Sequence, residues 1–266
     1  MKTAQFAACT ILIGLLSTTS LANEKKPVGS VTFWIGDVDI QECGKTQWDD
    51  ARLGQPLYEK DKIRTQEESR CEVTLTDQKI LRIGENTLFE VLRDSLGNTT
   101  PGIKSGKLWM NIRSIVDTEE FVVTTPTAVA AIRGTVYRIS CDANHSDYRI
   151  YEGIVAVTPV KEDGKTLEDS TFTLAAGEAL VVIKDFEEYN RQQKKALREF
   201  GKNEQEKREA FERQQGEEFA DFKRKDEAAF QQFKSFFVKL ERFDKEKDRK
   251  LDWVKWNLER DRVLER

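Results

Sequence analysis

The sequence has little of what enzymes use for catalysis. It holds one histidine among 266 residues. It contains neither a Gly-x-Ser-x-Gly elbow nor a His-Glu-x-x-His motif, and no Gly-rich phosphate loop. Adjacent acidic pairs such as Asp49-Asp50 and Glu119-Glu120 would point apart on strands, because successive side chains alternate between faces. We therefore predict no catalytic residue, no cofactor and no enzymatic activity.

Long hydrophobic runs are also missing beyond the first residues. Lys2 precedes an apolar core at 11–16, and Ser20-Leu21-Ala22 follows it as a small-x-small cleavage signal. No later run reaches the roughly 18 apolar residues of a membrane span. We predict a signal peptide at 1–22, with an uncleaved anchor as the alternative. Because Cys9 precedes the apolar core, we expect no lipid anchor.

Cysteines are few, and removal of the leader would leave three. An odd number leaves at least one unpaired. In an oxidising compartment we favour a Cys43–Cys71 bridge, because both residues lie in the upstream half, although the sequence leaves the pairing open. A metal site would have to use Cys141 and His145 with two neighbouring aspartates. With one histidine and no paired cysteine spacing, we favour a polar turn and predict no metal.

Residues 121–157 carry the pattern of short strands joined by turns. Four β-branched or aromatic runs are each bounded by Gly, Pro, Asn or Asp. They cover residues 121–123, 136–139, 148–151 and 154–157. The pattern predicts a mainly β fold.

The order of motifs resembles the FecR-type domain, a family named for a bacterial iron-dicitrate signal transducer. The resemblance rests on TPTAVAAIRGT at 125–135, EGIVAV at 152–157 and AGE at 176–178, and it extends over about 28–183. It implies a β-sandwich or β-roll, which we place at 23–183. We interpret the motif positions as marks of the fold, with the glycines at turns or bulges. These positions are Thr125, Pro126, Ala131, Arg133, Gly134, Thr135, Glu152, Gly153 and Gly177.

The resemblance also implies a regulatory role. Signalling members of the family relay a signal from an outer-membrane transporter to a cytoplasmic sigma factor, and they need a cytoplasmic segment and a membrane span. This sequence begins with a leader instead. We therefore expect an exported, periplasmic module that binds a protein or relays a signal, with secretion as the alternative location. Alternative functions are a structural, oligomerising envelope protein and a carbohydrate-binding or carbohydrate-active β protein.

The composition changes after residue 183 to that of a helix. All five prolines precede this point, and the remaining residues are rich in charged side chains. Acid-first pairs four residues apart, such as Glu204 with Arg208, stabilise helices. We predict one long, coiled-coil-like helix over 184–266.

An aromatic stripe follows this predicted helix with an eleven-residue period, which keeps it on one face. The stripe consists of Phe200, Phe211, Phe219, Phe222, Phe230 and Phe233. Leu240 with Leu251 and Phe243 with Val254 continue the spacing. Such a stripe needs cover, which the same molecule, a second copy or a partner helix could supply.

Charge narrows the choice of partner. The formal net charge is −4, and the excess acid lies in the β part. An acidic domain has no electrostatic reason to hold nucleic acid, and the balanced charge of the tail gives little attraction to a membrane surface. We expect a protein partner, with homo-oligomerisation through the helix as one form of it.

Overall fold

The structure is a computed structural model, and all statements below concern the residues that it describes. These are 26–76, 79–93, 98–112, 121–161, 166, 170–185, 188–192 and 237–264. The predicted signal peptide and the six phenylalanines of the stripe lie outside the described residues.

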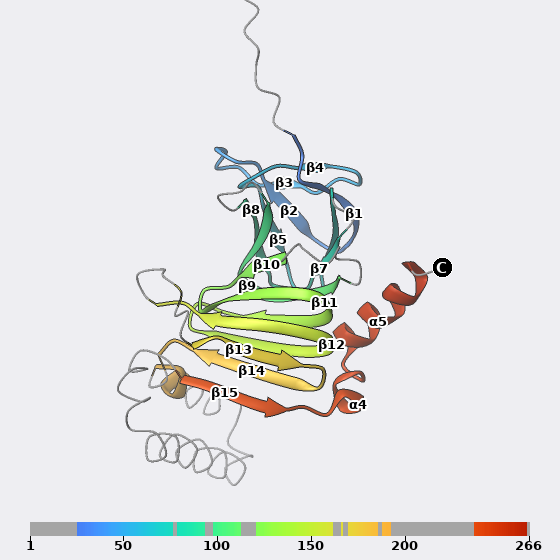
Figure 1. Ribbon diagram of the computed structural model, residues 1–266. Helices are drawn as coiled ribbons and strands as arrows, with labels where there is room; N and C mark the ends of the chain where they lie inside the picture. Colours follow the sequence, from blue (N-terminus) through green and yellow to red (C-terminus); the bar gives the residue numbers. More distant parts are fainter. Residues whose placement is uncertain are drawn as a thin grey trace, which may run out of the picture.

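The described residues form fifteen strands, two C-terminal helices and a helical segment at 188–192, so the predicted mainly β fold is confirmed (Figure 1). The strands are β1 Gly29–Ile35, β2 Val38–Gln41, β3 Asp49–Asp50, β4 Pro56–Leu57, β5 Lys62–Thr65, β6 Arg70–Leu75, β7 Ile80–Ile83, β8 Leu88–Arg93, β9 Thr99–Ile112, β10 Phe121–Thr124, β11 Ala128–Cys141, β12 His145–Pro159, β13 Phe172–Ala175, β14 Glu178–Ile183 and β15 Phe237–Arg242. The helices are α4 Lys245–Asp248 and α5 Asp252–Leu264.

The long strand β9 joins the two parts of the sheet. Its first half pairs with β8, which continues to β5, β2 and β3, whereas its second half lies between β7 and β11. On the β7 side the sheet continues through β6 and β1 to β4. On the other side it continues through β11, β12 and β14 to β15. Figure 1 shows β2, β5 and β8 gathered above the stacked strands β11 to β15.

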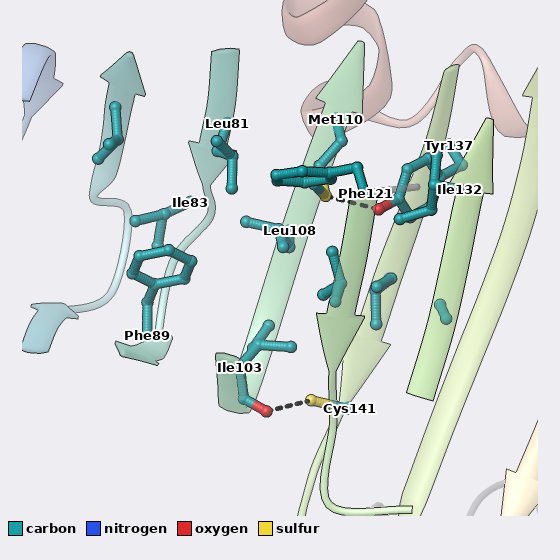
Figure 2. Packing of buried hydrophobic residues seen from close by; sticks show 14 of the residues in the cluster. Leu81, Ile83, Phe89, Ile103, Leu108, Met110, Phe121, Ile132, Tyr137 and Cys141 are labelled. Atoms are coloured by element: carbon teal, nitrogen blue, oxygen red, sulfur yellow. Dashed lines mark hydrogen bonds between the residues drawn. The ribbon is translucent and has the colours of Figure 1, made fainter. Parts of the chain in front are cut away.

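One hydrophobic cluster fills the space that these strands enclose. Burial alternates along β2, β5 and β10, as expected for strands with one face toward a core. Side chains from β7, β8, β9, β10 and β11 meet in this cluster (Figure 2). The Tyr137 hydroxyl donates to the Met110 sulfur at 2.7 Å within it. Burial raises the pKa of Tyr137, so its hydroxyl keeps its proton.

The predicted Cys43–Cys71 bridge does not form in this structure. Cys71 lies on β6 with its side chain in the core, whereas Cys43 is exposed in the turn after β2. One thiol is therefore in contact with solvent and the other is enclosed in the core. Cys141 is free and buried as well, and burial raises the pKa of Cys71 and of Cys141 to about 12.

The two glycines of the central motif lie at an irregularity in the β11–β12 ladder. The register shifts between Arg133 and Val136, and Gly134 and Gly153 both have positive φ there. A Cβ on Gly153 would overlap the carbonyl oxygen of Gly134. Because the ladder continues through this bulge, the two strands predicted at 148–151 and 154–157 are one strand, β12.

The prediction of one helix over 184–266 is wrong at its C-terminal end. Residues 237–242 form β15, which pairs with β14 and sets Leu240 opposite Leu180. The edge of β14 offers backbone hydrogen bonds that outweigh local helix preference. The eleven-residue spacing of Leu240 with Leu251 therefore joins a strand to a turn, not two points of one helix.

Candidate functional site

A row of large side chains crosses the outer face of the sheet, on the side away from the core. Residues directly opposite each other on adjacent strands share a face, so the strand register alone places them together. We call this set the outer row; it runs from β1 to β12 through Phe33, Glu72, Arg82, Trp109, Arg138 and Arg149.

The C-terminal residues 243–264, which we call the C-terminal clasp, lie across this row. Arg260 places its guanidinium 4.2 Å from the ring centre of Phe33 at one end. Asp261 contacts Arg82 in the middle, and Asp248 contacts Arg149 toward the other end. Figure 1 shows α4 beside the end of β15 and α5 continuing from it along the sheet. Asp244 caps α4 by accepting from two backbone amides.

Arg82 is the centre of the first buried charge cluster, with 1% of its surface exposed. Its Nε donates to Glu72 Oε2 at 2.9 Å, and its Nη1 donates to Asp261. Trp109 Nε1 also donates to Asp261 at 3.2 Å, and Arg260 Nε donates to Glu72 at 2.9 Å. Burial alone would raise the pKa of Glu72, but the hydrogen bonds from Arg260 and Arg82 outweigh it and lower that pKa.

Asp248 is the centre of the second cluster. Arg138 donates from Nε and Nη2 to its two oxygens at 3.1 and 2.8 Å, and Arg149 Nη1 donates at 3.1 Å. The Tyr151 hydroxyl donates to Asp248 as well. Burial lowers the pKa of Arg138, but Asp248 reverses this and raises it overall, while burial raises the pKa of Tyr151. Both clusters thus join a clasp carboxylate to arginines of the sheet.

An apolar contact lies between the two clusters. Trp109, Val136 and Tyr151 from the sheet and Val254 from α5 form a buried group that is separate from the main core. The rings of Trp109 and Tyr151 are 4.9 Å apart, and the edge of Phe243 meets Tyr151 at 5.5 Å. Burying a valine side chain such as Val254 contributes about 1.5 to 3 kcal/mol. Charge pairs and apolar burial therefore hold the clasp together.

A pocket of about 520 Å³ opens where the turn between α4 and α5 crosses the sheet. Its charged groups are largely paired with one another, since Arg70 pairs with Asp252 and Lys107 pairs with Glu85 at 2.9 Å. Arg70 also lies over the stacked rings of Trp253 and Trp256. The lining residues are Glu68, Arg70, Glu85, Lys107, Arg138, Leu251, Asp252, Trp253 and Val254. This lining contains no Ser, Thr, Cys or His side chain.

The motif residues predicted from the sequence lie elsewhere and support the fold. Thr125 precedes β11, where its hydroxyl lies 2.9 Å from both the Ala128 carbonyl and the Tyr148 hydroxyl. Gly177 is in the turn between β13 and β14, and Thr135 is fully buried on β11. Pro126, Ala131, Arg133 and Glu152 lie on or beside the same strands, and none of these positions belongs to the outer row.

The loop considered for a metal contains turn and packing contacts. Asp142 accepts hydrogen bonds from the backbone amides of Asn144 and His145, and the ring of His145 stacks on Tyr189 at 5.4 Å. Asp147 pairs with Arg149. Within the described ranges, no group of three His, Cys, Asp or Glu side chains gathers as a cation site.

Sequence reasoning missed the outer row and the clasp. It singled out neither Arg82 nor Arg138, and it placed residues 243–264 at the end of a long helix. One signal was available: Trp109 on β9 and Tyr151 on β12 are large aromatic residues at positions that alternate with core-facing ones. Large aromatic side chains at such positions indicate a covered face.

Comparison with known proteins supports the family resemblance. Residues 61–156 match the family model described as "FecR protein", so the chain contains a FecR-type domain, which runs from β5 into β12. No curated protein matches the chain.

Solved structures show weaker similarity. Two crystal structures of a "putative anti-sigma factor from Parabacteroides distasonis ATCC 8503" each align at 16% identity with a TM-score of 0.39, covering 46% of this chain and 54% of that one. The alignment thus spans about half the length of those proteins. A "Cell surface anchoring domain" aligns at 22% identity with a TM-score of 0.23, covering 24% of this chain and 84% of its own. In the described part of the chain, no helix has the length and apolar character needed to cross a membrane.

Proposed function

We propose that this protein is a non-enzymatic, exported regulatory module that binds a protein partner and relays a signal through its FecR-type domain. The family match over 61–156 is the observation that carries this proposal. The matched segment includes Arg82, Trp109 and Arg138, so the part that resembles a signalling family also provides the centre of the outer row.

The composition of the outer face supports a protein partner. Trp, Tyr and Arg are the residues that contribute most to protein–protein binding energy, and the face that the clasp covers combines Trp109, Tyr151 and several arginines. Apolar side chains also reach solvent beside it: Ile35 is 44% exposed and Leu251 is 50% exposed. Ile35 lies opposite Arg70 on the adjacent strand, so it borders the pocket and the clasp.

Export rests on the predicted leader. We expect the mature protein to begin at Asn23 and to fractionate with the periplasm, with the culture medium as the alternative. N-terminal sequencing of the protein purified from cell fractions checks both points. A protein that starts at Met1 and stays in the cytoplasm would contradict this part of the proposal.

Site-specific photo-crosslinking in intact cells tests partner binding. A photoreactive residue at Ile35 should yield one discrete protein adduct, because that position borders the proposed interface. The matched control is Ile154, which is 55% exposed on β12. Adducts that are equal at both positions, or absent from both, would argue against a partner at this face.

The signalling role has its own readout. Deleting the gene should change a defined set of transcripts, and the wild-type gene should restore them. An Ile35→Asp variant should accumulate normally, because the side chain is already exposed, yet fail to restore the transcripts. If this variant fully restores the transcripts, signalling does not depend on the surface around Ile35.

A further inference from the structure

The C-terminal clasp binds the sheet as a separate protein helix would. We propose that the outer row is a docking surface for an amphipathic helix of a partner protein that carries two carboxylates beside an apolar stripe, and that the clasp is a resident mimic which that helix displaces. The inference rests on the proposed function and deepens it by naming the surface and the chemistry of the partner.

Charge complementarity is the first argument. The sheet contributes Arg82, Arg138 and Arg149, and the clasp contributes Asp261 and Asp248 against them. The sheet also supplies carboxylates of its own, Glu72 against Arg82 and Asp147 against Arg149. Arg138 pairs with Asp248 of the clasp. The clasp thus adds one acid to each cluster, and a helix that takes its place needs acids at the same two points, because a buried charge that loses its partner is strongly unfavourable.

The apolar centre is the second argument. Trp109 is fully buried, and so is Val254, which packs against it from the clasp. Without the clasp, Trp109, Val136 and Tyr151 would form an apolar patch surrounded by arginines. Exposed patches of this composition mark protein interfaces, and a helix with one apolar stripe is the element that fits them.

The third argument is that side chains hold the clasp, so another helix can reproduce its contacts. Beyond β15, the Phe243 amide donates a backbone hydrogen bond to the Gly177 carbonyl, and this is the last backbone–backbone hydrogen bond to the sheet among the described residues. The remaining contacts of α4 and α5 are ion pairs, side-chain hydrogen bonds and apolar packing. They depend on the identity of side chains and not on chain connectivity.

The fit of the clasp is incomplete, which favours exchange. Asn257 is fully buried, but its side-chain oxygen has no hydrogen-bond partner in the described chain, and the same is true of Trp253 Nε1. Burying polar atoms without partners weakens the hold of the resident helix. A partner helix that keeps the two carboxylates and satisfies or removes these atoms would bind this face more tightly.

A binding experiment on the full chain tests the proposal, with a labelled peptide of residues 243–264 as the probe. In the double variant Asp248→Asn/Asp261→Asn the resident clasp loses its two buried carboxylates but keeps the Arg260–Glu72 and Asp252–Arg70 pairs, while the sheet keeps its arginines. The peptide should bind this variant at least about tenfold more tightly than it binds wild type. In wild type the resident clasp competes with the peptide, and a clasp that covers the outer row about nine-tenths of the time lowers the apparent affinity of the peptide about tenfold. Fluorescence anisotropy measures both constants.

Matched controls isolate the two buried carboxylates. The variant Glu246→Gln/Asp252→Asn removes the same charge from exposed clasp positions, whose side chains are 78% and 84% exposed, and should bind the peptide as wild type does. A peptide carrying the Asp248→Asn and Asp261→Asn changes should not bind either protein. Equal binding by all variants or by both peptides would overturn the charge argument.

A second measurement keeps the test decisive if the double variant folds poorly. Saturating peptide added to wild-type protein should accelerate hydrogen exchange of the resident α5 amides, because the peptide takes their place. No acceleration and no peptide binding would show that the clasp is a permanent part of the fold. The Ile35 crosslink could still succeed in that case, so the proposed function would stand while this inference fails.

Light scattering separates a partner helix from a second copy of this chain. The proposal expects the double variant to stay monomeric without peptide and to bind one peptide per chain. A dimer that forms by mutual exchange of clasps would overturn the proposal in favour of self-association.

Discussion

Replacing Asp261 with alanine should be among the most damaging single changes in the clasp. Asp261 is 4% exposed and contacts the Arg82 guanidinium, which is 1% exposed. The substitution leaves that guanidinium with Glu72 as its one carboxylate partner and with the Asn257 carbonyl, and it leaves Trp109 Nε1 without its acceptor. Removing one partner of a buried ion pair costs about 3 to 5 kcal/mol. Because Glu72 remains, we expect a loss near the lower end, about 3 kcal/mol.

Asp252→Ala is the matched control. Asp252 also pairs with an arginine of the sheet, Arg70, but its side chain is 84% exposed. Exposed ion pairs contribute about 0 to 1 kcal/mol, since water and salt screen them. Both variants remove a carboxylate from α5, so the difference between their losses of stability measures the effect of burying the ion pair.

Urea unfolding followed by tryptophan fluorescence measures both losses, because Trp109, Trp253 and Trp256 lie in the clasp contact. The free energy of unfolding in water should fall about 3 kcal/mol for Asp261→Ala and less than about 1 kcal/mol for Asp252→Ala. Losses of equal size would refute the reasoning, since they would show that Arg82 does not depend on Asp261.

Three further predictions use other parts of the fold. Gly153→Ala should destabilise the protein far more than Gly134→Ala, as thermal unfolding of the two variants can measure. Both positions have positive φ, which costs a residue with a side chain about 1 to 2 kcal/mol, but only at Gly153 would the new Cβ also overlap backbone atoms. Because the pKa of Glu72 is lower in the folded state, its ionised carboxylate stabilises the fold above about pH 4.5, and this contribution is lost as the pH falls through the folded-state pKa. In urea titrations at several pH values, the free energy of unfolding of Glu72→Gln should therefore depend less on acid pH than that of wild type. A thiol reagent should modify Cys43 in the native protein and reach Cys71 only on unfolding, as mass spectrometry can count; rapid labelling of Cys71 would contradict its burial.

Local patterns in the sequence predicted strands in β10, β11 and β12 but not how they continue. The runs at 148–151 and 154–157 were each recognised as β structure, and they are parts of β12. The glycine between them was predicted at a turn or a bulge, and the structure uses Gly153 for a bulge opposite Gly134. A single sequence does not distinguish these outcomes, because the difference lies in whether a partner strand continues alongside.

The candidate site shows the same limit more strongly. Each member of the outer row lies on a different strand, and Arg82 and Trp109 become neighbours only through the register of β7 against β9. Their burial depends in turn on Val254 and Asp261, far along the chain. Spacing within one segment carries no information on such contacts.

By itself the sequence determined that the region from 28 to 183 is built from β-strands and resembles the FecR family, because side-chain alternation and turn residues act over a few positions. Only the tertiary structure decided that residues 237–242 become a strand and that the clasp covers the arginines of the sheet. The free edge of β14 and the charged outer face exist only after the sheet has formed. Their attraction for the tail therefore acts between distant residues and overrides the local helical pattern.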